Sequence, residues 1–230
     1  MPSTDKMTAP HRWKSLYSGV KESRHTSTAQ KEAQKAVPQF CRKLLSIVVG
    51  PEPNIAAFND GKPVETSIGF TSTEGIPSLH GCGDTDASFV FLLDNAGMNL
   101  ADIMAVFSKR DGLCALPGNG NCSFSTILNA GVDSTAYQIL RYYVLRNIGS
   151  AIAYMGGADV FYIHGEHLGA EILPFIKDIC RPFKFKGLQY LEKTDYENDP
   201  IQISTPDSTI TVLYSQHTRS DLLKHCMVSC

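Results

Sequence analysis

Hydrophobic residues form three short runs between positions 44 and 70 of the sequence. The runs are LLSIVVG, NIAAF and PVETSIGF, at positions 44–50, 54–58 and 63–70, and they are rich in the residues that strands favour. Asn59-Asp60-Gly61 separates the second run from the third, and Asp-Gly is a strong signal for a tight hairpin turn. The pattern therefore predicts a domain that opens with three strands.

The spacing of the apolar residues becomes helical after Asp84. It predicts one helix over 88–95 and a second helix that begins after Asn99, a residue type that caps helix N-termini well. A Gly- and Asn-rich loop is expected at 111–123. The second helix is predicted to turn an apolar stripe inward, formed by Leu100, Ile103, Met104 and Phe107.

The longest predicted helix opens at Asp133 and Ser134 and stops at Gly156-Gly157. At 1.5 Å per residue it is roughly 30 Å long, which is enough to cross a domain. A buried strand at 158–165, a helix at about 170–179, a polar loop at 190–208, a strand at 208–215 and a helix at 219–227 follow. The core-facing positions of the long helix are predicted to be Ile139, Leu140, Tyr143, Val144, Ile148, Ala151 and Ile152.

This order of elements predicts an α/β fold in which helices flank a mixed sheet. Residues 1–28 are polar, and a short helix over 29–37 would end at Pro38. The chain is accordingly divided into a polar N-terminal segment with a linker helix, 1–43, and one domain, 44–230. The order also resembles the ribonuclease H-like unit of actin, Hsp70 and the sugar and acetate kinases.

The composition and charge of the chain limit which kinds of partner and which cell compartment are expected. The formal net charge is −2, so nucleic acid and anionic membranes are not expected as partners. No apolar run reaches 18 residues, and the N-terminus lacks the apolar stretch of a signal peptide. The seven cysteines are odd in number and contain no C-x-x-C pair, which favours reduced thiols and a cytoplasmic protein.

The stretch NIAAFNDGKPVETSIGFTSTEGIPSLHGCGDTD at 54–86 resembles the acetate kinase family. AYMGGADVFYIHG at 153–165 and the turn Asp111-Gly112-Leu113 resemble that family as well. Together the matches span roughly residues 45–215 and correspond to the second of the two domains of an acetate kinase. The resemblance implies the ribonuclease H-like fold and the conversion of ATP and acetate to ADP and acetyl phosphate with Mg²⁺.

The resemblance also assigns positions to that chemistry. It places catalytic residues at His25, in the weakly matching stretch 24–28, and at His80. It places a metal-associated residue at His217. The positions that it implies for nucleotide binding are Gly50, Asn54, Cys122, Phe124, Gly165 and Glu166.

The sequence differs from the family at the positions that bind and stabilise the phosphate groups. The first phosphate loop falls at 48–52, where Val48 replaces a His, Pro51 lacks an N–H and Glu52 adds negative charge. The catalytic Arg of the family falls at Gly81. Since phosphoryl transfer depends on cations and N–H donors, these changes predict a weakly active or inactive half of a kinase.

Other interpretations stay open. The chain is alternatively a non-catalytic module that forms a homodimer or pairs with a full-length relative, with the long helix as contact surface, or a truncated gene product. Glu74, Asp84 and Asp86 are either relics of the site or residues that shape turns. His164 and His167 form a metal pair or an incidental one, and 118–121 is a flexible loop or a phosphate cradle.

Overall fold

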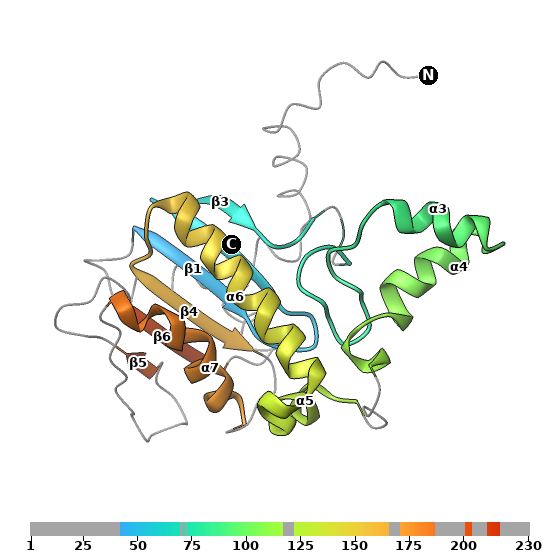
Figure 1. Ribbon diagram of the computed structural model, residues 1–230. Helices are drawn as coiled ribbons and strands as arrows, with labels where there is room; N and C mark the ends of the chain where they lie inside the picture. The colour runs from blue at the N-terminus through green and yellow to red at the C-terminus, as the bar shows by residue number, and fades with distance from the viewer. Residues whose placement is uncertain are drawn as a thin grey trace, which may run out of the picture.

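The computed structural model of the chain describes residues 42–69, 71, 73–116, 122–165, 171–186, 201–203 and 211–216. At its centre lies a six-stranded sheet in the order β3-β2-β1-β4-β6-β5 (Figure 1). The strands β1, β4 and β6 are parallel, whereas β2, β3 and β5 join the sheet through antiparallel pairs. The predicted mixed sheet is therefore confirmed. The strands are β1 (Lys43–Val48), β2 (Asn54–Asn59), β3 (Lys62–Thr66), β4 (Val160–Gly165), β5 (Ile201–Ile203) and β6 (Thr211–Gln216).

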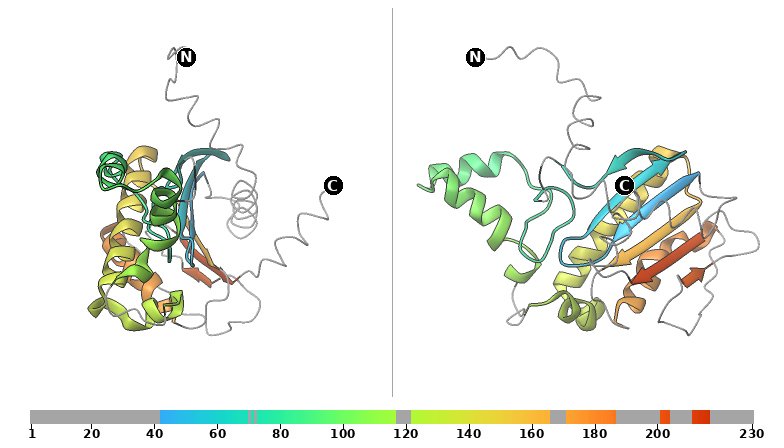
Figure 2. Two further views of the ribbon diagram at one scale, coloured as in Figure 1. Left: turned by 90° about the vertical axis from the view of Figure 1, so that its right-hand side faces the viewer. Right: turned by 180° about the vertical axis from the view of Figure 1, so that it is seen from behind.

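Helices α6 and α7 lie on one face of this sheet, as Figure 2 shows. Helix α6 packs across β1, β2 and β3, and α7 packs against α5 and α6. The α-helices are α3 (Ser88–Asn95), α4 (Leu100–Ala105), α5 (Phe124–Ala130), α6 (Thr135–Met155) and α7 (Ile172–Cys180). A π-helical turn (Val106–Arg110) and three 3-10 turns (Leu113–Ala115, Gly131–Asp133 and Arg181–Lys186) complete the described elements.

The predicted hairpin joins β2 to β3. Asn59 pairs with Lys62, so Asp60 and Gly61 form a two-residue loop. Both have positive φ, 48° and 77°, which is the backbone that a type I′ turn requires. Asp and Gly tolerate this conformation at little cost, so the sequence itself sets the register of the first strands.

Helix α6 has the ends that the sequence predicts. The Ser134 hydroxyl accepts a hydrogen bond from the Tyr137 N–H, and Gly156 adopts the left-handed conformation that ends a helix. Lys43 Nζ then donates to the Gly156 carbonyl at 3.1 Å. The predicted core-facing stripe is confirmed. Leu140, Val144, Ile148 and Ala151 are buried, and Ile139, Tyr143 and Ile152 pack against the same core.

Successive side chains of a strand point to opposite faces of the sheet. In this sheet the side chains on both faces are apolar. Leu45 and Ile47 of β1 join Phe161 and Ile163 of β4 in the core beneath α6 and α7. The opposite face forms a second buried cluster, made of Leu44, Ala56, Phe58, Val160 and Tyr162. The predicted buried strand at 158–165 is thereby explained, since β4 needs apolar residues on both of its sides.

Three expectations were wrong in part. Leu100 and Met104 are exposed instead of facing a core, because among the described elements α4 packs mainly against the π-helical turn and α3, and only Ile103 of the stripe is buried. Helix α5 was missed, and β5 falls inside the stretch expected to be a loop. The predicted helices at 29–37 and 219–227 lie outside the described residues. Within the described part, no helix has both the length and the apolar content that a membrane crossing requires.

Candidate functional site

The parallel strands β1, β4 and β6 end at one edge of the sheet. Val48 pairs with His164, and Gly165 pairs with Gln216, so the three carboxyl ends are level. Ligands of open α/β sheets bind at this edge, because the loops that leave the strands there face a common space. The sequence-predicted nucleotide positions Gly50 and Gly165 lie at this edge, as does Asn54, the first residue of β2.

The loop after β1 presents little that attracts a phosphate. Pro51 and Glu52 are exposed, and Pro51 has no N–H to donate. The Pro51 carbonyl instead accepts a hydrogen bond of 3.0 Å from the Leu79 N–H. Gly50 is buried, and a Cβ there would meet no atom within 4 Å, so the backbone lies open on that side. Two residues after Gly50, Glu52 adds an exposed carboxylate to this loop.

A second loop, residues 78–82, packs against the first through that Leu79 hydrogen bond. The Ser78 hydroxyl accepts the Gly81 N–H at 2.7 Å and thereby closes the turn. Gly81, the position to which the resemblance assigns the family's catalytic Arg, is buried, and a Cβ would lie 2.9 Å from the Ser78 Oγ. His80 is exposed next to it. The turn thus offers an imidazole but no guanidinium.

The turn at 112–114 supports this second loop. The Leu113 N–H donates to the Ser78 carbonyl at 2.9 Å, and the Cys114 N–H donates to the Leu79 carbonyl at 3.0 Å. A Cβ on Gly112 would lie 2.4 Å from the His80 N, so only glycine allows this approach. The Asp111-Gly112-Leu113 turn that resembles the family therefore holds the backbone around His80.

Cys114 and Cys122 form a disulfide, which corrects the expectation that the cysteines are reduced. Of the other described cysteines, Cys82 and Cys180 are free thiols, and burial raises the pKa of Cys180 to about 12. Cys122 precedes Ser123, whose hydroxyl caps α5 by accepting the Thr126 N–H. Phe124 is only 4% exposed and belongs to the core, so its ring does not face the sheet edge.

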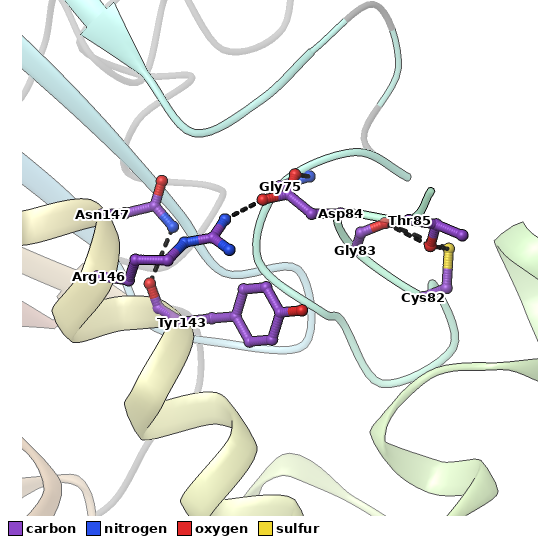
Figure 3. Close-up of polar contacts among 8 residues, drawn as sticks. All are labelled: Gly75, Cys82, Gly83, Asp84, Thr85, Tyr143, Arg146 and Asn147. Carbon is purple, nitrogen blue, oxygen red and sulfur yellow. Dashed lines mark hydrogen bonds and ion pairs between the residues drawn. The ribbon is translucent and has the colours of Figure 1, made fainter. Parts of the chain in front are cut away.

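Asp84 connects the loop region to the long helix, as Figure 3 shows. Its carboxylate forms an ion pair with Arg146 of α6 and accepts the Gly75 N–H at 3.0 Å. The Asp84 N–H in turn donates to the Gly75 carbonyl at 2.9 Å. Arg146 also stacks on Tyr143, with 4.7 Å between Cζ and the ring centroid. This set, Gly75, Asp84, Tyr143 and Arg146, is called the Asp84 clamp below.

The clamp favours the structural interpretation of the carboxylates. The Asp86 carboxylate accepts the Ser88 N–H at 2.8 Å at the start of α3, and this hydrogen bond lowers the pKa of Asp86. The Glu74 carboxylate lies directly over Gly69, where a Cβ would collide with it. Sequence reasoning placed Tyr143 in the core-facing stripe but missed Arg146 and its contact with Tyr143, although their i, i+3 spacing places both on one face of α6.

The remaining predicted site residues cannot be placed. His25, Glu166 and His217 lie outside the described residues, as do His167 and the stretch 118–121. Among the described residues, no group of three His, Cys, Asp or Glu side chains is arranged to hold a metal ion. The described residues at the sheet edge do not fit a Mg²⁺-bound triphosphate, because they supply an exposed Glu and a Pro where cations and N–H donors are needed.

Comparisons with known proteins agree on one family. The model of the Acetokinase family matches residues 19–223. An acetate kinase of Parabacteroides distasonis is 29% identical over an alignment of 184 residues, and the match covers 77% of this chain and 46% of that protein. An acetate kinase of Thermoanaerobacter pseudethanolicus is 31% identical, with 74% of this chain and 44% of that protein covered.

Solved structures show the same fold. The acetate kinase of Porphyromonas gingivalis superimposes with a TM-score of 0.73 at 22% identity, covering 89% of this chain and 54% of that one. A propionate kinase of Francisella tularensis gives a TM-score of 0.69 at 21% identity and covers 88% and 53%. The chain spans about half the length of the curated relatives it matches. By its sequence match and its fold, this chain is a member of the acetokinase family.

Proposed function

We propose that this chain keeps the fold of the second domain of an acetate kinase without efficient phosphoryl transfer from ATP to a short carboxylic acid. The observation that carries the proposal is the loop after β1, where Pro51 and Glu52 are exposed at the carboxyl edge of the sheet. A proline without an N–H and a carboxylate both disfavour a triphosphate at this place.

The size of the effect follows from the chemistry of the transfer. The moving phosphoryl group spreads negative charge over its oxygens, and enzymes stabilise that charge with cations and oriented N–H groups. Each lost donor costs about 3 kcal/mol of transition-state stabilisation. Such losses are not additive, but a hydrophobic Val48, a carboxylate at Glu52 and a buried Gly81 together remove most of the expected rate.

The role that we propose for the chain is assembly, as a homodimer or through pairing with a full-length relative. ATP, Mg²⁺ and a short carboxylic acid are the ligands that family membership suggests, and we propose that they bind this chain poorly. Support for assembly comes from large apolar side chains that stay exposed outside the core, above all on α3 and α4.

Acetyl phosphate formation by the purified chain tests the catalytic proposal. With ATP, Mg²⁺ and acetate, we expect no turnover above background, while the Parabacteroides distasonis enzyme serves as positive control. Turnover within the range of about 1–100 s⁻¹ that is typical of kinases would overturn the proposal.

Nucleotide titration by calorimetry tests the cause. We expect no heat of ATP binding for the wild-type chain and a measurable affinity for the variant V48H/P51N/E52G, which restores the donors of the family loop. A variant that stays silent would show that this loop is not what prevents binding.

A further inference from the structure

The Cys114–Cys122 disulfide joins a surface turn to a helix that is anchored in the core. Cys114 lies in the 3-10 turn Leu113–Ala115, and Cys122 lies two residues before the start of α5. Three residues of α5 are buried, so the core holds this short helix in place. The bond therefore fixes the position of the turn relative to a firmly held element.

The turn passes this position on to the second loop, residues 78–82. Two backbone hydrogen bonds, of 2.9 Å and 3.0 Å, run from the turn to the carbonyls of Ser78 and Leu79. Gly112 lies so close to this loop that a Cβ would be 2.4 Å from the His80 N. Because these contacts join backbone to backbone, with no flexible side chain between them, a displaced turn displaces the loop.

The second loop in turn holds the loop after β1. The Leu79 N–H donates to the Pro51 carbonyl at 3.0 Å. Pro51 lies between the buried Gly50 and the exposed Glu52, at the carboxyl edge of the sheet. The contacts that begin at the disulfide thus continue, without interruption, to the candidate site.

The disulfide is also within reach of solvent. Cys114 and Cys122 are each half-buried, whereas the free thiol of Cys180 is buried in the core. Exposure matters because a thiolate must reach one of the two sulfurs before a disulfide is exchanged. Cys82 is half-buried too, but it is a free thiol, and its sulfur accepts the Thr85 hydroxyl at 3.1 Å (Figure 3). Among the described cysteines, the Cys114–Cys122 pair is the one whose reduction cuts a covalent bond.

We propose that this disulfide is a redox switch that controls how firmly the two loops at the sheet edge are held. A dithiol opens it by exchange: one thiolate attacks a cysteine sulfur and forms a mixed disulfide, and the second thiol then displaces that sulfur. The two cysteines gain two electrons and two protons and become thiols, while the reductant becomes a disulfide. Oxidised glutathione reverses the reaction and leaves as two thiols.

Reduction removes the tether between the turn and α5 and leaves the rest of the core unchanged. Leu113 stays buried, so the turn keeps one anchor and opens more often without unfolding. Local openings of this kind depend on the contacts of the segment itself and not on the stability of the whole fold. The inference goes beyond the proposed function, because it concerns the order of the loops and not catalysis or assembly.

Amide hydrogen exchange of the full chain, followed by NMR, tests the switch. The chain is first oxidised with oxidised glutathione and then reduced with dithiothreitol. The amides of Leu79, Leu113 and Cys114 should exchange about 10-fold faster or more after reduction, since each donates one of the hydrogen bonds between the loops. Reoxidation should restore their protection. Amides in the middle of α6 should stay protected in both states at the same exchange times.

Two variants locate the effect. C114S/C122S should exchange at the reduced rate in both conditions. The matched control is Cys82→Ser, which removes a half-buried thiol of the same loop without touching the disulfide and should keep the full response to dithiothreitol.

A third variant tests the role of the turn. Gly112→Ala drives a Cβ into the His80 backbone, so it should loosen the second loop even while the disulfide is intact. Peptide mapping verifies the state of the bond, and circular dichroism verifies that each variant folds. The comparison of oxidised and reduced wild type needs no variant.

Four results would overturn the switch. The first is equal exchange of the three amides in the oxidised and reduced chains. The second is free thiols at Cys114 and Cys122 after treatment with oxidised glutathione. The third is a Cys82→Ser chain that no longer responds to dithiothreitol. The fourth is opening of α6 at the same exchange times, which would make the bond a general brace of the fold.

Discussion

The Asp84 clamp and the loop after β1 both lie in the region that matches the acetokinase family, yet they differ in what their charges do. The Asp84 carboxylate is engaged twice, by Arg146 and by the Gly75 N–H. Glu52 is exposed, and none of the ion pairs between described residues joins it to a cation. A charged residue at a position that resembles an active-site residue can therefore have a purely structural role. The contacts that its side chain makes distinguish a structural role from a functional one.

The largest expected effect in the clamp is that of Gly75→Ala. Gly75 has a φ of 107°, and a Cβ would lie 1.9 Å from the Ser67 carbonyl oxygen, so both backbone strain and a collision arise. We expect a loss of about 3 kcal/mol in the free energy of unfolding, measured by urea denaturation. Gly97→Ala is the control, because φ is 87° but nothing lies within 4 Å, and about 1 kcal/mol is expected. Equal losses would show that the turn is not tightly packed.

The disulfide next to the loops should contribute somewhat less. It links Cys114 and Cys122 across a sequence separation of 8, and closing such a short loop stabilises by about 2–3 kcal/mol. C114S/C122S should lose this amount in chemical denaturation. Dithiothreitol should destabilise the wild type to the level of the variant and leave the variant unchanged. A reductant that lowers the stability of both would assign the effect to another cysteine.

Asp84→Ala should cost about 1–2 kcal/mol. The side chains of Asp84 and Arg146 are 39% and 42% exposed, so solvent screens the ion pair, and the hydrogen bond to Gly75 supplies the rest. A double-mutant cycle with Arg146→Ala should give a coupling of about 0.5–1 kcal/mol. A coupling of zero would remove Arg146 from the clamp.

Tyr137 connects α6 to α7 and gives a pH-dependent test. Its hydroxyl donates to Asp178 at 3.1 Å, and Arg141 contacts the same carboxylate at 2.6 Å. Burial and the Asp178 charge raise the pKa of Tyr137 to about 12, above its usual 10. The neutral phenol stabilises the fold fully below pH 10, and this stability is lost as pH rises toward 12.

Tyr137→Phe should therefore lose about 1 kcal/mol at pH 8 and fall less steeply than the wild type between pH 10 and 12. Stability curves at several pH values measure both effects. Parallel curves for the two proteins would exclude Tyr137 as the titrating group.

Glu52→Gln completes the comparison with the smallest effect. An exposed side chain outside a network changes the free energy of unfolding by no more than about 0.5 kcal/mol. A larger loss in denaturation experiments would mean that Glu52 has a structural partner, and the contrast with Asp84 would then fail.

Patterns local to the chain predicted much of this fold. The hairpin at Asp60-Gly61 and the limits of α6 were correct because turn and cap chemistry depends on neighbouring residues alone. The stripe at Leu100 and Met104 was wrong because a helical period shows which face is apolar but not what that face packs against. The Cys114–Cys122 bond was missed since spacing without a C-x-x-C pattern does not reveal which thiols meet.

At the site, sequence reasoning found the altered loop but not the contacts around it. The substitutions at Val48, Pro51 and Glu52 are visible in the sequence. The hydrogen bond from Leu79 to Pro51 and the Arg146–Asp84 pair join segments distant in the chain, and only the fold brings them together. Phe124 was assigned by resemblance alone, and its burial depends on α5, which was not predicted.

The position of β1 in the sheet has a consequence for synthesis of the chain. Lys43 at its start contacts Asp159 across a sequence separation of 116 residues, so β1 gains its parallel neighbour only after this long intervening segment has been synthesised. Until then, its outer edge offers unpaired N–H and C=O groups beside apolar Leu44 and Ile47. A nascent chain that has not yet reached residue 160 would therefore carry an open template for intermolecular strand pairing.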